Sequence, residues 1–411
     1  MKILVIGTLY EPDLGPSAPL YSMLCKGLVQ RGHKVIVLTT VPHYPSGQVP
    51  TAFRGKWIWR SSEHGVDIIR VGLPSVNRAH LAKRLLQFFI YQLGATIAGI
   101  GIKYDVVLVA NPSLSVWLPF FWFVVLRKKP AIYSVHDVYP DVGIKLGIFK
   151  NKFLISLVTA IERFCLKHAK LVRILSESFI PEMLNLGVPE SKIRLIYDWV
   201  DTTLIVPLPR ESNFSTEYGL NDRFVILYAG NIGLSQGLEH ILTSAQFLSD
   251  QTDILFLFVG DGAGKDSLQI DASKRQLLNV QFIPFQPRER LPEVLACGDV
   301  SLVILRQGIS TASLPSKTYS IMASGRPILA SVDEESELFR LIKHAEAGLC
   351  IPPENPEKLV DAIRTLKQDK VLCKRLGDNG RNWVEQNHSP HYATDEYERL
   401  IFEAISLKKS N

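Results

Sequence analysis

The sequence predicts an α/β protein built from two doubly wound parallel-sheet halves. At 411 residues the chain is longer than one hydrophobic core usually organises, so two domains are expected. Short apolar runs that suit strands buried on both faces alternate with amphipathic helical segments. This alternation begins near residue 3 and begins again near residue 224, after an irregular stretch that contains prolines.

In the first half, the strand expected at 3–7 leads into a loop rich in glycine and proline and then into an amphipathic helix. That helix should end at Gly32, because glycine readily adopts the left-handed conformation that follows a helix C-terminus. Further strands are expected at 34–39, 66–71, 106–110, 131–135, 171–175 and 193–196.

The second half opens with the run FVILYAG at 224–230 and a helix near 237–248. Its other buried strands are expected at 254–260, 280–283, 300–305, 327–331 and 348–351, and an amphipathic helix follows at 391–407. We therefore assign residues 1–205 to an N-terminal domain, 206–388 to a C-terminal domain and 389–411 to a final helix, with an irregular linker at 201–219. Ligands should bind at the carboxyl ends of the strands, in a cleft between the halves.

The composition suits a folded protein of a reducing compartment. Hydrophobic residues make up 46% of the chain and charged residues 21%, which excludes wholesale disorder. The five cysteines are scattered, without a C-x-x-C pair, which argues against a disulfide scaffold or a structural zinc site. Because the first apolar run follows directly on Met1 and Lys2, we expect no secretory signal and a cytoplasmic location.

Charge divides unevenly between the halves. Residues 1–210 carry 25 Lys and Arg against 13 Asp and Glu, whereas residues 211–411 carry 21 against 27. This asymmetry speaks against uniform binding to nucleic acid and favours an anionic partner for the first half, such as a phospholipid surface or a pyrophosphate-bearing acceptor. Random drift of surface charge is the alternative.

The apolar segment 114–126 is too short to cross a membrane, which takes ~20 residues. It is either a buried crossover helix or an interfacial helix, with Trp117 and Trp122 at headgroup depth and the basic cluster 127–129 on anionic lipid. Residues 83–102 offer a second apolar surface. Together with the basic first half, this favours peripheral contact with the inner face of the cell membrane.

Loops that follow strands carry the candidate chemistry. Residues 229–237 open a helix, where backbone amides and the helix dipole can approach a diphosphate, although a tight turn explains them equally well. Arg306 follows another strand, and Ser316 is expected to cap the next helix. Lys317 would lie at the positive end of that helix, which suits a bound anion better than helix stability; a solvated surface lysine is the alternative. Residues 260–266 match neither a Walker nor a dinucleotide glycine motif.

The segments GNIGLSQGLE, VGDG, LPEVLACGDVSLVIL and LPSKTYSIMASGRPILA, in this order, resemble the C-terminal half of retaining nucleotide-sugar glycosyltransferases of the GT-B fold, family GT4. The segments GTLYEPDLGPSAP, RGHKVIVLT, PHYPSG, SVHDVYPD and IYDWVDTTLI resemble the branch that serves bacterial exopolysaccharide, capsule or O-antigen assembly, which includes colanic-acid and N-acetylfucosamine transferases. The resemblance implies two Rossmann-like domains facing a central cleft and a final helix crossing back to the first domain.

The resemblance also implies roles for individual residues. His136 and Asp137 match a His-Asp pair whose histidine approaches the transferred sugar, and Phe285 and Gln286 match a segment that contacts the nucleobase. The full set expected to bind the donor is Gly15, Asn231, Gly233, Gln236, Asp261, Phe285, Gln286, Arg306, Ser316, Lys317 and Ser320.

Two departures from the family pattern matter. Many members carry Arg and Lys where this chain has Asn231 and Gln236, and their paired glutamates would fall on Ala312 and Ser320. Because leaving-group stabilisation needs positioned cationic donors, we expect Arg306 and Lys317 to supply the missing charge.

The reaction implied is transfer with retention from a nucleotide-sugar, with UDP favoured, to a saccharide acceptor that a polyprenyl pyrophosphate carries. No metal or other cofactor is expected, because the chain contains no D-x-D triplet. Two alternatives remain: a sugar-nucleotide epimerase of the same fold, and a degenerate, non-catalytic partner subunit whose best support is the lost glutamate pair.

Overall fold

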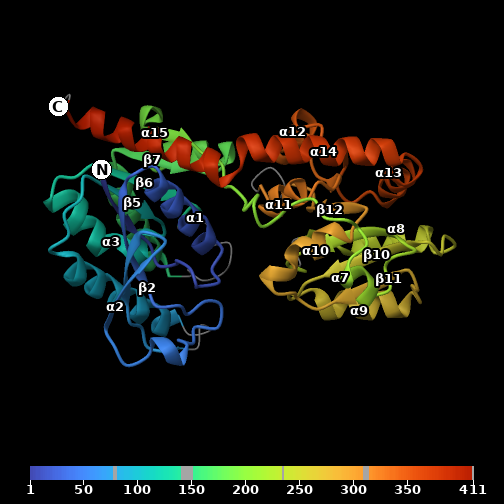
Figure 1. Ribbon diagram of the computed structural model, residues 1–411, viewed down its shortest axis with the longest axis horizontal. Coiled ribbons are helices and arrows are strands. Elements are labelled where there is room, and N and C mark those ends of the chain that lie inside the picture. The colour runs from blue at the N-terminus through green and yellow to red at the C-terminus, as the bar shows by residue number, and fades with distance from the viewer. Residues whose placement is uncertain (77–80, 140–150, 234–235, 309–313, 410–411) are drawn as a thin grey trace. The chain divides into compact units, whose positions relative to one another are not determined.

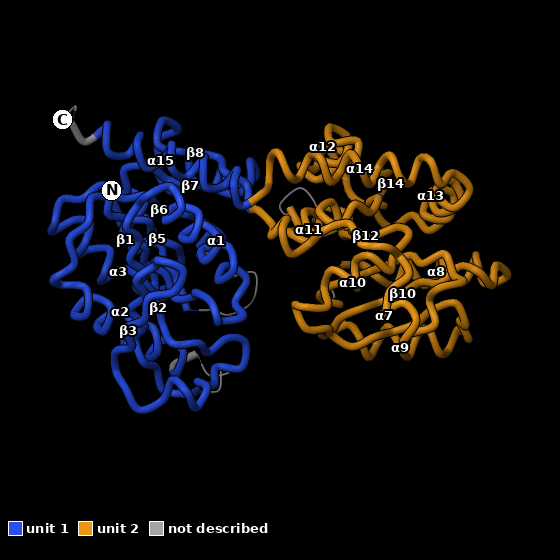
Figure 2. Tube along the Cα trace, in the orientation of Figure 1, with its two compact units in different colours: residues 1–198, 390–411 blue, residues 199–389 orange. Residues whose placement is uncertain are grey.

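The computed structural model describes residues 1–76, 81–139, 151–233, 236–308 and 314–409. The chain divides into two compact units, each of which is described by itself (Figure 2). Unit 1 comprises Met1–Asp198 and Pro390–Asn411, and unit 2 comprises Trp199–Ser389. The C-terminal segment therefore belongs to the same unit as the N-terminus.

Unit 1 is built on one sheet with the strand order β3-β4-β2-β1-β5-β6-β7-β8. Every pairing in it is parallel except that of β3 with β4. The seven strands predicted for this half are confirmed. The strands are β1 (Lys2–Ile6), β2 (Lys34–Thr40), β3 (Ile58–Glu63), β4 (Val66–Val71), β5 (Val106–Ala110), β6 (Ala131–Val135), β7 (Leu171–Ile174) and β8 (Ile193–Leu195).

Sequence reasoning missed the edge strand β3. Its residues IWRSSE are half-buried or exposed, so they form no apolar run. A tight turn with positive φ at His64 and Gly65 joins it to β4 as an antiparallel hairpin.

The helices of unit 1 are α1 (Ser17–Gln30), α2 (Leu81–Gly99), α3 (Ser113–Phe120), α5 (Lys152–His168), α6 (Ile180–Asn185) and α15 (Pro390–Lys409) (Figure 1). A π-helical turn at Phe121–Leu126 continues α3, so the apolar segment 114–126 forms the crossover between β5 and β6. Gly32 has φ +82°, as predicted for the residue after α1.

Helix α15 packs against α1 within unit 1. Arg31 and His33, at the end of α1, pair with Glu398 of α15 at 3.0 and 2.7 Å. Gly27 allows close approach, because a Cβ there would lie 2.2 Å from Oγ1 of Thr394. The last helix is thus an integral part of the first unit.

Unit 2 is built on a wholly parallel sheet with the strand order β11-β10-β9-β12-β13-β14. This is the doubly wound order of Rossmann-like domains, and it confirms the predicted fold. The strands are β9 (Phe224–Ala229), β10 (Ile254–Val259), β11 (Val280–Ile283), β12 (Val300–Ile304), β13 (Ile328–Ser331) and β14 (Gly348–Ile351). Helices cover the sheet, with apolar clusters on both faces.

The helices of unit 2 are α7 (Asn213–Glu217), α8 (Glu239–Phe247), α9 (Lys265–Lys274), α10 (Leu291–Ala296), α11 (Lys317–Ala323), α12 (Glu337–His344), α13 (Pro356–Gln368) and α14 (Lys370–Asn387). The stretch 201–219, expected to be irregular, contains α7. A reciprocal capping box between Ser212 and Ser215 begins this short helix, a signal that the sequence interpretation overlooked.

Strand order reverses between β1 and β5 in unit 1, and between β9 and β12 in unit 2. Ligands of such sheets bind outside the carboxyl ends of the strands at these switch points. In unit 1, Gly7 and Asn111 follow the two strands. In unit 2, Gly230 and Arg306 lie at the corresponding ends.

Candidate functional sites

Two glycine-containing turns meet backbone to backbone at the carboxyl edge of the unit 2 sheet. Gly230 follows β9 with φ +135°, and Gly260 and Gly262 follow β10 with φ +152° and +153°. A Cβ on Gly260 would lie 2.0 Å from the carbonyl oxygen of Gly230, and one on Gly262 would lie 2.5 Å from that of Ile232. Only glycine fits at these positions. The turns therefore present backbone atoms at the edge of the sheet, and we call the region formed by Gly230, Gly260 and Gly262 the glycine surface.

Lys317 reaches this glycine surface from the first turn of α11. Its ammonium nitrogen lies 4.0 Å from the centre of the Tyr228 ring and 3.8 Å from the position that a Cβ on Gly230 would take. The nitrogen is buried and has no hydrogen-bond partner among the described residues. Burial lowers the pKa of Lys317 to about 8. A buried cation that lacks a hydrogen-bond acceptor is a natural contact for an anionic ligand.

Tyr228 also orders the turn that follows β9. Its hydroxyl donates to the backbone oxygen of Asn231 at 2.7 Å and lies 3.4 Å from Oε1 of Gln236. Asn231 and Gln236 therefore stand beside the ring that Lys317 overlies. Gly233 belongs to the same turn, while its neighbours at 234–235 lie outside the described residues.

Arg306 follows β12 at the same edge, but two carboxylates neutralise its charge. Its guanidinium donates to Glu239 of α8 and lies 3.7 Å from Glu354. The sequence interpretation placed Arg306 correctly after its strand and did not foresee these partners. Among the described residues, Arg306 is paired with carboxylates, whereas the ammonium of Lys317 has no such partner. Of the two expected cations, Lys317 is therefore the one whose charge the described residues leave unpaired at the glycine surface.

The expected cap of α11 is not formed. Ser316 occupies the N-cap position, but its backbone is helical and its side chain makes no capping hydrogen bond. A capping serine normally has extended backbone, which brings its oxygen over the first amides. Ser316 is exposed and Ser320 is half-buried, so both hydroxyls stay on the accessible side of α11.

The other expected donor contacts also follow strands of unit 2. Phe285 comes just after β11 and is 73% exposed, so its ring is accessible to a ligand. The amide of Gln286 donates to the carbonyl of Pro284 at 3.0 Å. Asp261 is exposed, and its carboxylate accepts from the backbone of Gly262 at 2.9 Å. Ala312 lies outside the described residues.

In unit 1, His136 follows β6 and lies close to the switch point of the sheet. Its Nε2 is 3.1 Å from the hydroxyl of Tyr21, and its backbone N–H donates to Oδ1 of Asn111 at 3.0 Å. Burial lowers the pKa of His136 to about 4, although Asp198 partly opposes the shift. The imidazole is therefore neutral at neutral pH and can donate or accept one hydrogen bond. The neighbouring Asp137 is exposed.

A buried polar group in the same unit acts electrostatically on His136, because Asp198 and Arg173 both affect its pKa. Arg173 is fully buried and donates to Asp198 at 2.8 Å, while its guanidinium lies 6.0 Å from the ring of Tyr397 in α15. The hydroxyl of Tyr397 is 3.1 Å from that of Ser134, two residues before His136. Helix α15 therefore contributes to the floor of this site.

The loop around Gly15 is fixed by the buried carboxylate of Asp13. This carboxylate accepts from the backbone of Gly15 at 3.0 Å and from that of His43 at 2.8 Å. Burial alone would raise the pKa of Asp13, but its hydrogen bonds with His43 outweigh this effect and hold the pKa below its usual value. Gly15 itself is buried, and a Cβ there would lie 2.4 Å from the Leu9 side chain.

Sequence reasoning missed most residues that hold these sites in place. Tyr21, Arg173, Asp198 and Tyr397 come from separate elements, and no local pattern connects them. Asn111 could have been found, because it is a polar residue directly after a predicted buried strand. Among the residues that the structure describes, no group of three or more His, Cys, Asp or Glu is arranged to hold a metal ion.

Known families match both halves of the chain. Residues 21–204 match the family described as Glycosyltransferase Family 4, and residues 211–383 match the one described as Glycosyl transferases group 1. The chain belongs to the GT-B glycosyltransferases of family 4.

Two curated relatives of this glycosyltransferase span nearly the same length. It is 29% identical over 374 residues to a putative colanic acid biosynthesis glycosyl transferase, WcaI, from Escherichia coli, covering 89% of this chain and 91% of the relative. It is 26% identical over 355 residues to the probable glycosyltransferase WbjE from Pseudomonas aeruginosa, covering 82% and 84%.

Solved structures share the fold of this glycosyltransferase at low identity. Sucrose-phosphate synthase from Thermosynechococcus elongatus matches with a TM-score of 0.73 and 18% identity, covering 99% of this chain and 100% of that one. HepE from Anabaena, solved in complex with UDP, matches with a TM-score of 0.71 and 16% identity, covering 98% and 100%.

The expected membrane contact receives one correction. The indole nitrogen of Trp122 is buried, so this N–H cannot hydrogen-bond to lipid headgroups, whereas Trp117 is 38% exposed. Among the described residues of this glycosyltransferase, no helix combines the length and the apolar character that crossing a membrane requires.

Proposed function

We propose that the chain transfers a sugar from a nucleotide diphosphate-sugar, with UDP favoured, to a saccharide acceptor carried by a lipid such as polyprenyl pyrophosphate. The observation that carries this proposal is the buried ammonium of Lys317, which lies against the glycine surface and has no hydrogen-bond partner among the described residues. The diphosphate of the donor would pair with this ammonium and with nearby backbone amides. HepE, a solved structure with a similar fold, contains bound UDP, and this supports uridine as the nucleoside of the donor.

In the proposed reaction, the bond between the anomeric carbon and the diphosphate oxygen breaks while the acceptor oxygen attacks from the same face, with retention. The acceptor proton passes to the departing diphosphate. Lys317 would stabilise the charge that develops on the leaving group. His136, neutral and held by Tyr21, would hydrogen-bond the transferred sugar and so orient it.

We propose that no metal takes part in this reaction. The support is that the sequence has no D-x-D triplet and that Lys317 offers a positive charge where a cation would otherwise neutralise the diphosphate. Strong inhibition by EDTA that manganese reverses would overturn this part of the proposal.

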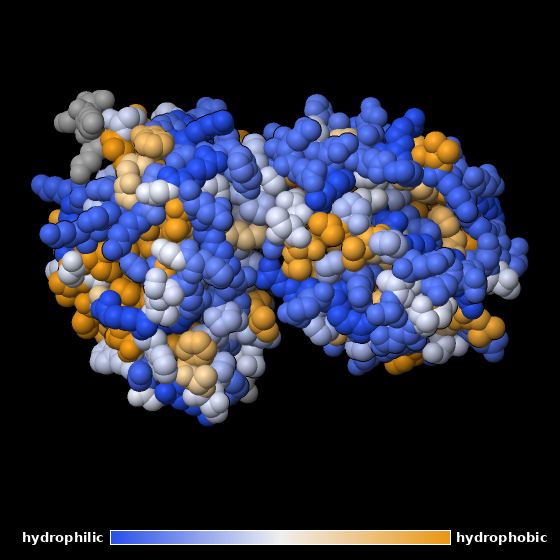
Figure 3. Space-filling model, in the orientation of Figure 1, coloured by the Kyte–Doolittle hydropathy of each residue, from blue (hydrophilic) through white to orange (hydrophobic). Residues whose placement is uncertain are grey.

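We further propose that unit 1 lies against the inner face of the cell membrane and that the product enters a bacterial surface polysaccharide. Exposed apolar side chains are grouped on adjacent helices, as Figure 3 shows over α2 and α3. They are Leu86, Phe89 and Ile97 of α2, Trp117 of α3, and Phe153 and Leu157 of α5. Lys83 and Lys152 add positive charge near the starts of α2 and α5. The description of WcaI as a colanic acid biosynthesis enzyme supports the polysaccharide assignment.

Vesicle binding tests the membrane surface. The double variant Phe89→Ser/Ile97→Ser should lose most of its co-sedimentation with vesicles that contain anionic lipid. Phe247→Ser, which removes a similarly exposed phenylalanine from unit 2, should bind like the wild type. Equal binding by all three proteins would contradict this surface.

A thermal-shift screen against UDP, GDP and a panel of nucleotide-sugars tests the donor, followed by product analysis with a lipid-linked saccharide. Stabilisation by UDP and transfer to the acceptor are expected. Conversion of the donor without any acceptor would indicate the epimerase alternative. Absence of both transfer and donor hydrolysis would indicate the non-catalytic one.

A further inference from the structure

A cavity lies in unit 2, at the edge of the sheet opposite to the glycine surface. Its volume is about 420 Å³, within the ~300–1,000 Å³ typical of small-molecule sites. Phe224 begins β9, Asp299 precedes β12 and Pro327 precedes β13, so the cavity is lined at the amino ends of three strands. A donor bound at the carboxyl ends would not occupy it.

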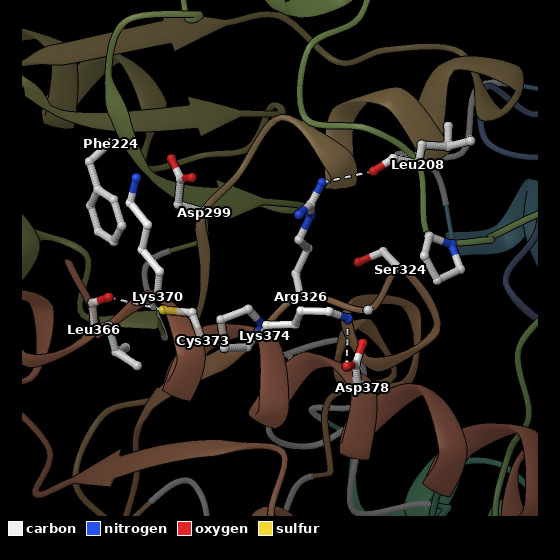
Figure 4. Close-up of a pocket in the computed structure, with 13 residues that line it drawn as sticks. Leu208, Phe224, Asp299, Ser324, Arg326, Leu366, Lys370, Cys373, Lys374 and Asp378 are labelled. Carbon is white, nitrogen blue, oxygen red and sulfur yellow. Dashed lines mark hydrogen bonds and ion pairs between the residues drawn. The ribbon is translucent and has the colours of Figure 1, made fainter. Parts of the chain in front are cut away.

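Three basic side chains line the cavity, and two carboxylates accompany them (Figure 4). Lys374 pairs with Asp378 at 2.7 Å. Asp299 pairs with Arg210 at 2.9 Å and accepts from the backbone of Val225 at 2.7 Å. Both carboxylates therefore already have positive or hydrogen-bonding partners.

Two positive charges remain, on Arg326 and Lys370. Arg326 is fixed in the wall, because its Nη2 donates to the carbonyls of Leu208 at 2.9 Å and Ala296 at 2.7 Å. Its Nε is buried and has no hydrogen-bond partner among the described residues. Lys370 has no ion pair among them, and in Figure 4 it extends toward the side of the cavity formed by Phe224 and Asp299.

Apart from the hydroxyl of Ser324, the rest of the lining is mostly apolar. The ring of Phe224, the prolines at 207 and 327 and the side chain of Leu366 form walls around the charged groups. A ligand that matches this lining carries negative charge, which Lys370 and Arg326 favour, and has a compact apolar or ring-shaped body. A phosphate monoester, with a charge of about −1.5 to −2 at neutral pH, has both properties.

We propose that this cavity is a second binding site, separate from the donor site, for a small phosphate monoester with a ring-shaped body. The proposal does not depend on the identity of the sugar donor, because the residues involved lie at the opposite ends of the strands.

Calorimetric titration with phenyl phosphate, in the presence of saturating UDP, tests the site. We expect one equivalent to bind to the wild type, and Lys370→Glu to weaken binding at least tenfold by reversing one of the two available charges. Lys370 is exposed at the start of α14, where an acidic residue favours the helix, so this variant should fold. Arg375→Glu, a matched change on the same helix outside the lining, should bind like the wild type.

Lys317→Ala separates this site from the donor site. Phenyl phosphate should bind to this variant as to the wild type, even if UDP proves not to be the donor. Binding that disappears in Lys317→Ala and persists in Lys370→Glu would place the anion at the donor site and overturn the proposal. Absence of binding to the wild type, or equal binding of phenol without its phosphate, would also overturn it.

Discussion

The ammonium nitrogen of Lys317 lies 4.0 Å from the centre of the Tyr228 ring, and it is buried at the carboxyl edge of the unit 2 sheet. The ring offers the cation a favourable face, but a cation–π contact contributes only ~0.5–2 kcal/mol. That is small beside the cost of burying a charge, and the lowered pKa of Lys317, about 8, reflects this imbalance. A diphosphate would restore the balance.

Affinity for UDP should therefore depend on pH. Lys317 is protonated below its pKa of about 8 and attracts the diphosphate, and it loses this charge as the pH rises. The dissociation constant of UDP should increase about tenfold between pH 7 and pH 9, since only about a tenth of the ammonium remains one unit above the pKa. Calorimetric titration with UDP between pH 7 and pH 9 measures this dissociation constant. Lys317→Arg, which does not titrate there, should show a flat profile, and an equal slope in that variant would refute the assignment.

His136 should affect turnover more than donor affinity. It lies in unit 1, whereas the proposed diphosphate contacts lie in unit 2. His136→Ala should lower kcat about 10²-fold, a size typical of a lost positioned hydrogen-bonding group, and change the dissociation constant of UDP less than twofold.

Tyr21→Phe is a test of positioning, because it removes only the hydroxyl that lies 3.1 Å from Nε2 of His136. It should reduce kcat by a smaller factor, about tenfold, with little change in KM. Steady-state kinetics of both variants separates the two parameters. An increase in KM with no change in kcat would contradict the proposed role of His136.

Glu162 should make the protein less stable at neutral and alkaline pH than at pH 5. This carboxyl of α5 is buried and accepts from the hydroxyl of Tyr133 at 3.1 Å. Burial raises its pKa to about 7, so the folded protein retains a proton that the unfolded chain loses near its ordinary pKa. The free energy of unfolding falls as the pH rises from about 4.5 through 7. Glu162→Gln should therefore stabilise the protein at pH 8 by ~1–3 kcal/mol and much less at pH 5. Urea unfolding at pH 8 and pH 5 measures this stabilisation. Equal stabilisation at the two pH values would contradict the prediction.

Gly260→Ala should damage unit 2 directly. The added Cβ would lie 2.0 Å from the carbonyl oxygen of Gly230, and the φ of +152° would be strained in alanine. We expect a loss of ~2 kcal/mol or more in unfolding free energy, together with weaker UDP binding. Gly101→Ala, where a Cβ meets open space, is the control and should melt like the wild type. Similar melting of both variants would count against the close contact of the two turns.

The fold could be predicted because buried parallel strands leave a simple signal. Runs such as ILFLFV at 254–259 are apolar on both faces, and the glycines between strands and helices mark the turns. The edge strand β3 gave no such signal, because its polar side chains face solvent.

The site could be predicted only in part. The positions of Lys317 and His136 could be anticipated because Lys317 begins a predicted helix and His136 follows a predicted strand. The carboxylates of Glu239 and Glu354 beside Arg306 were not, because they come from distant segments that only the fold brings together. The same holds for Tyr397, whose place beside Ser134 depends on the return of α15 to unit 1.

Calorimetric binding of UDP to Lys317→Ala tests the central claim most directly, with the exposed Lys274→Ala as the control. A charged hydrogen bond contributes ~1.5–3 kcal/mol, so the dissociation constant should rise between about tenfold and about 150-fold in Lys317→Ala and stay unchanged in the control. Unchanged UDP affinity and unchanged turnover in Lys317→Ala would show that the donor is not held by this lysine.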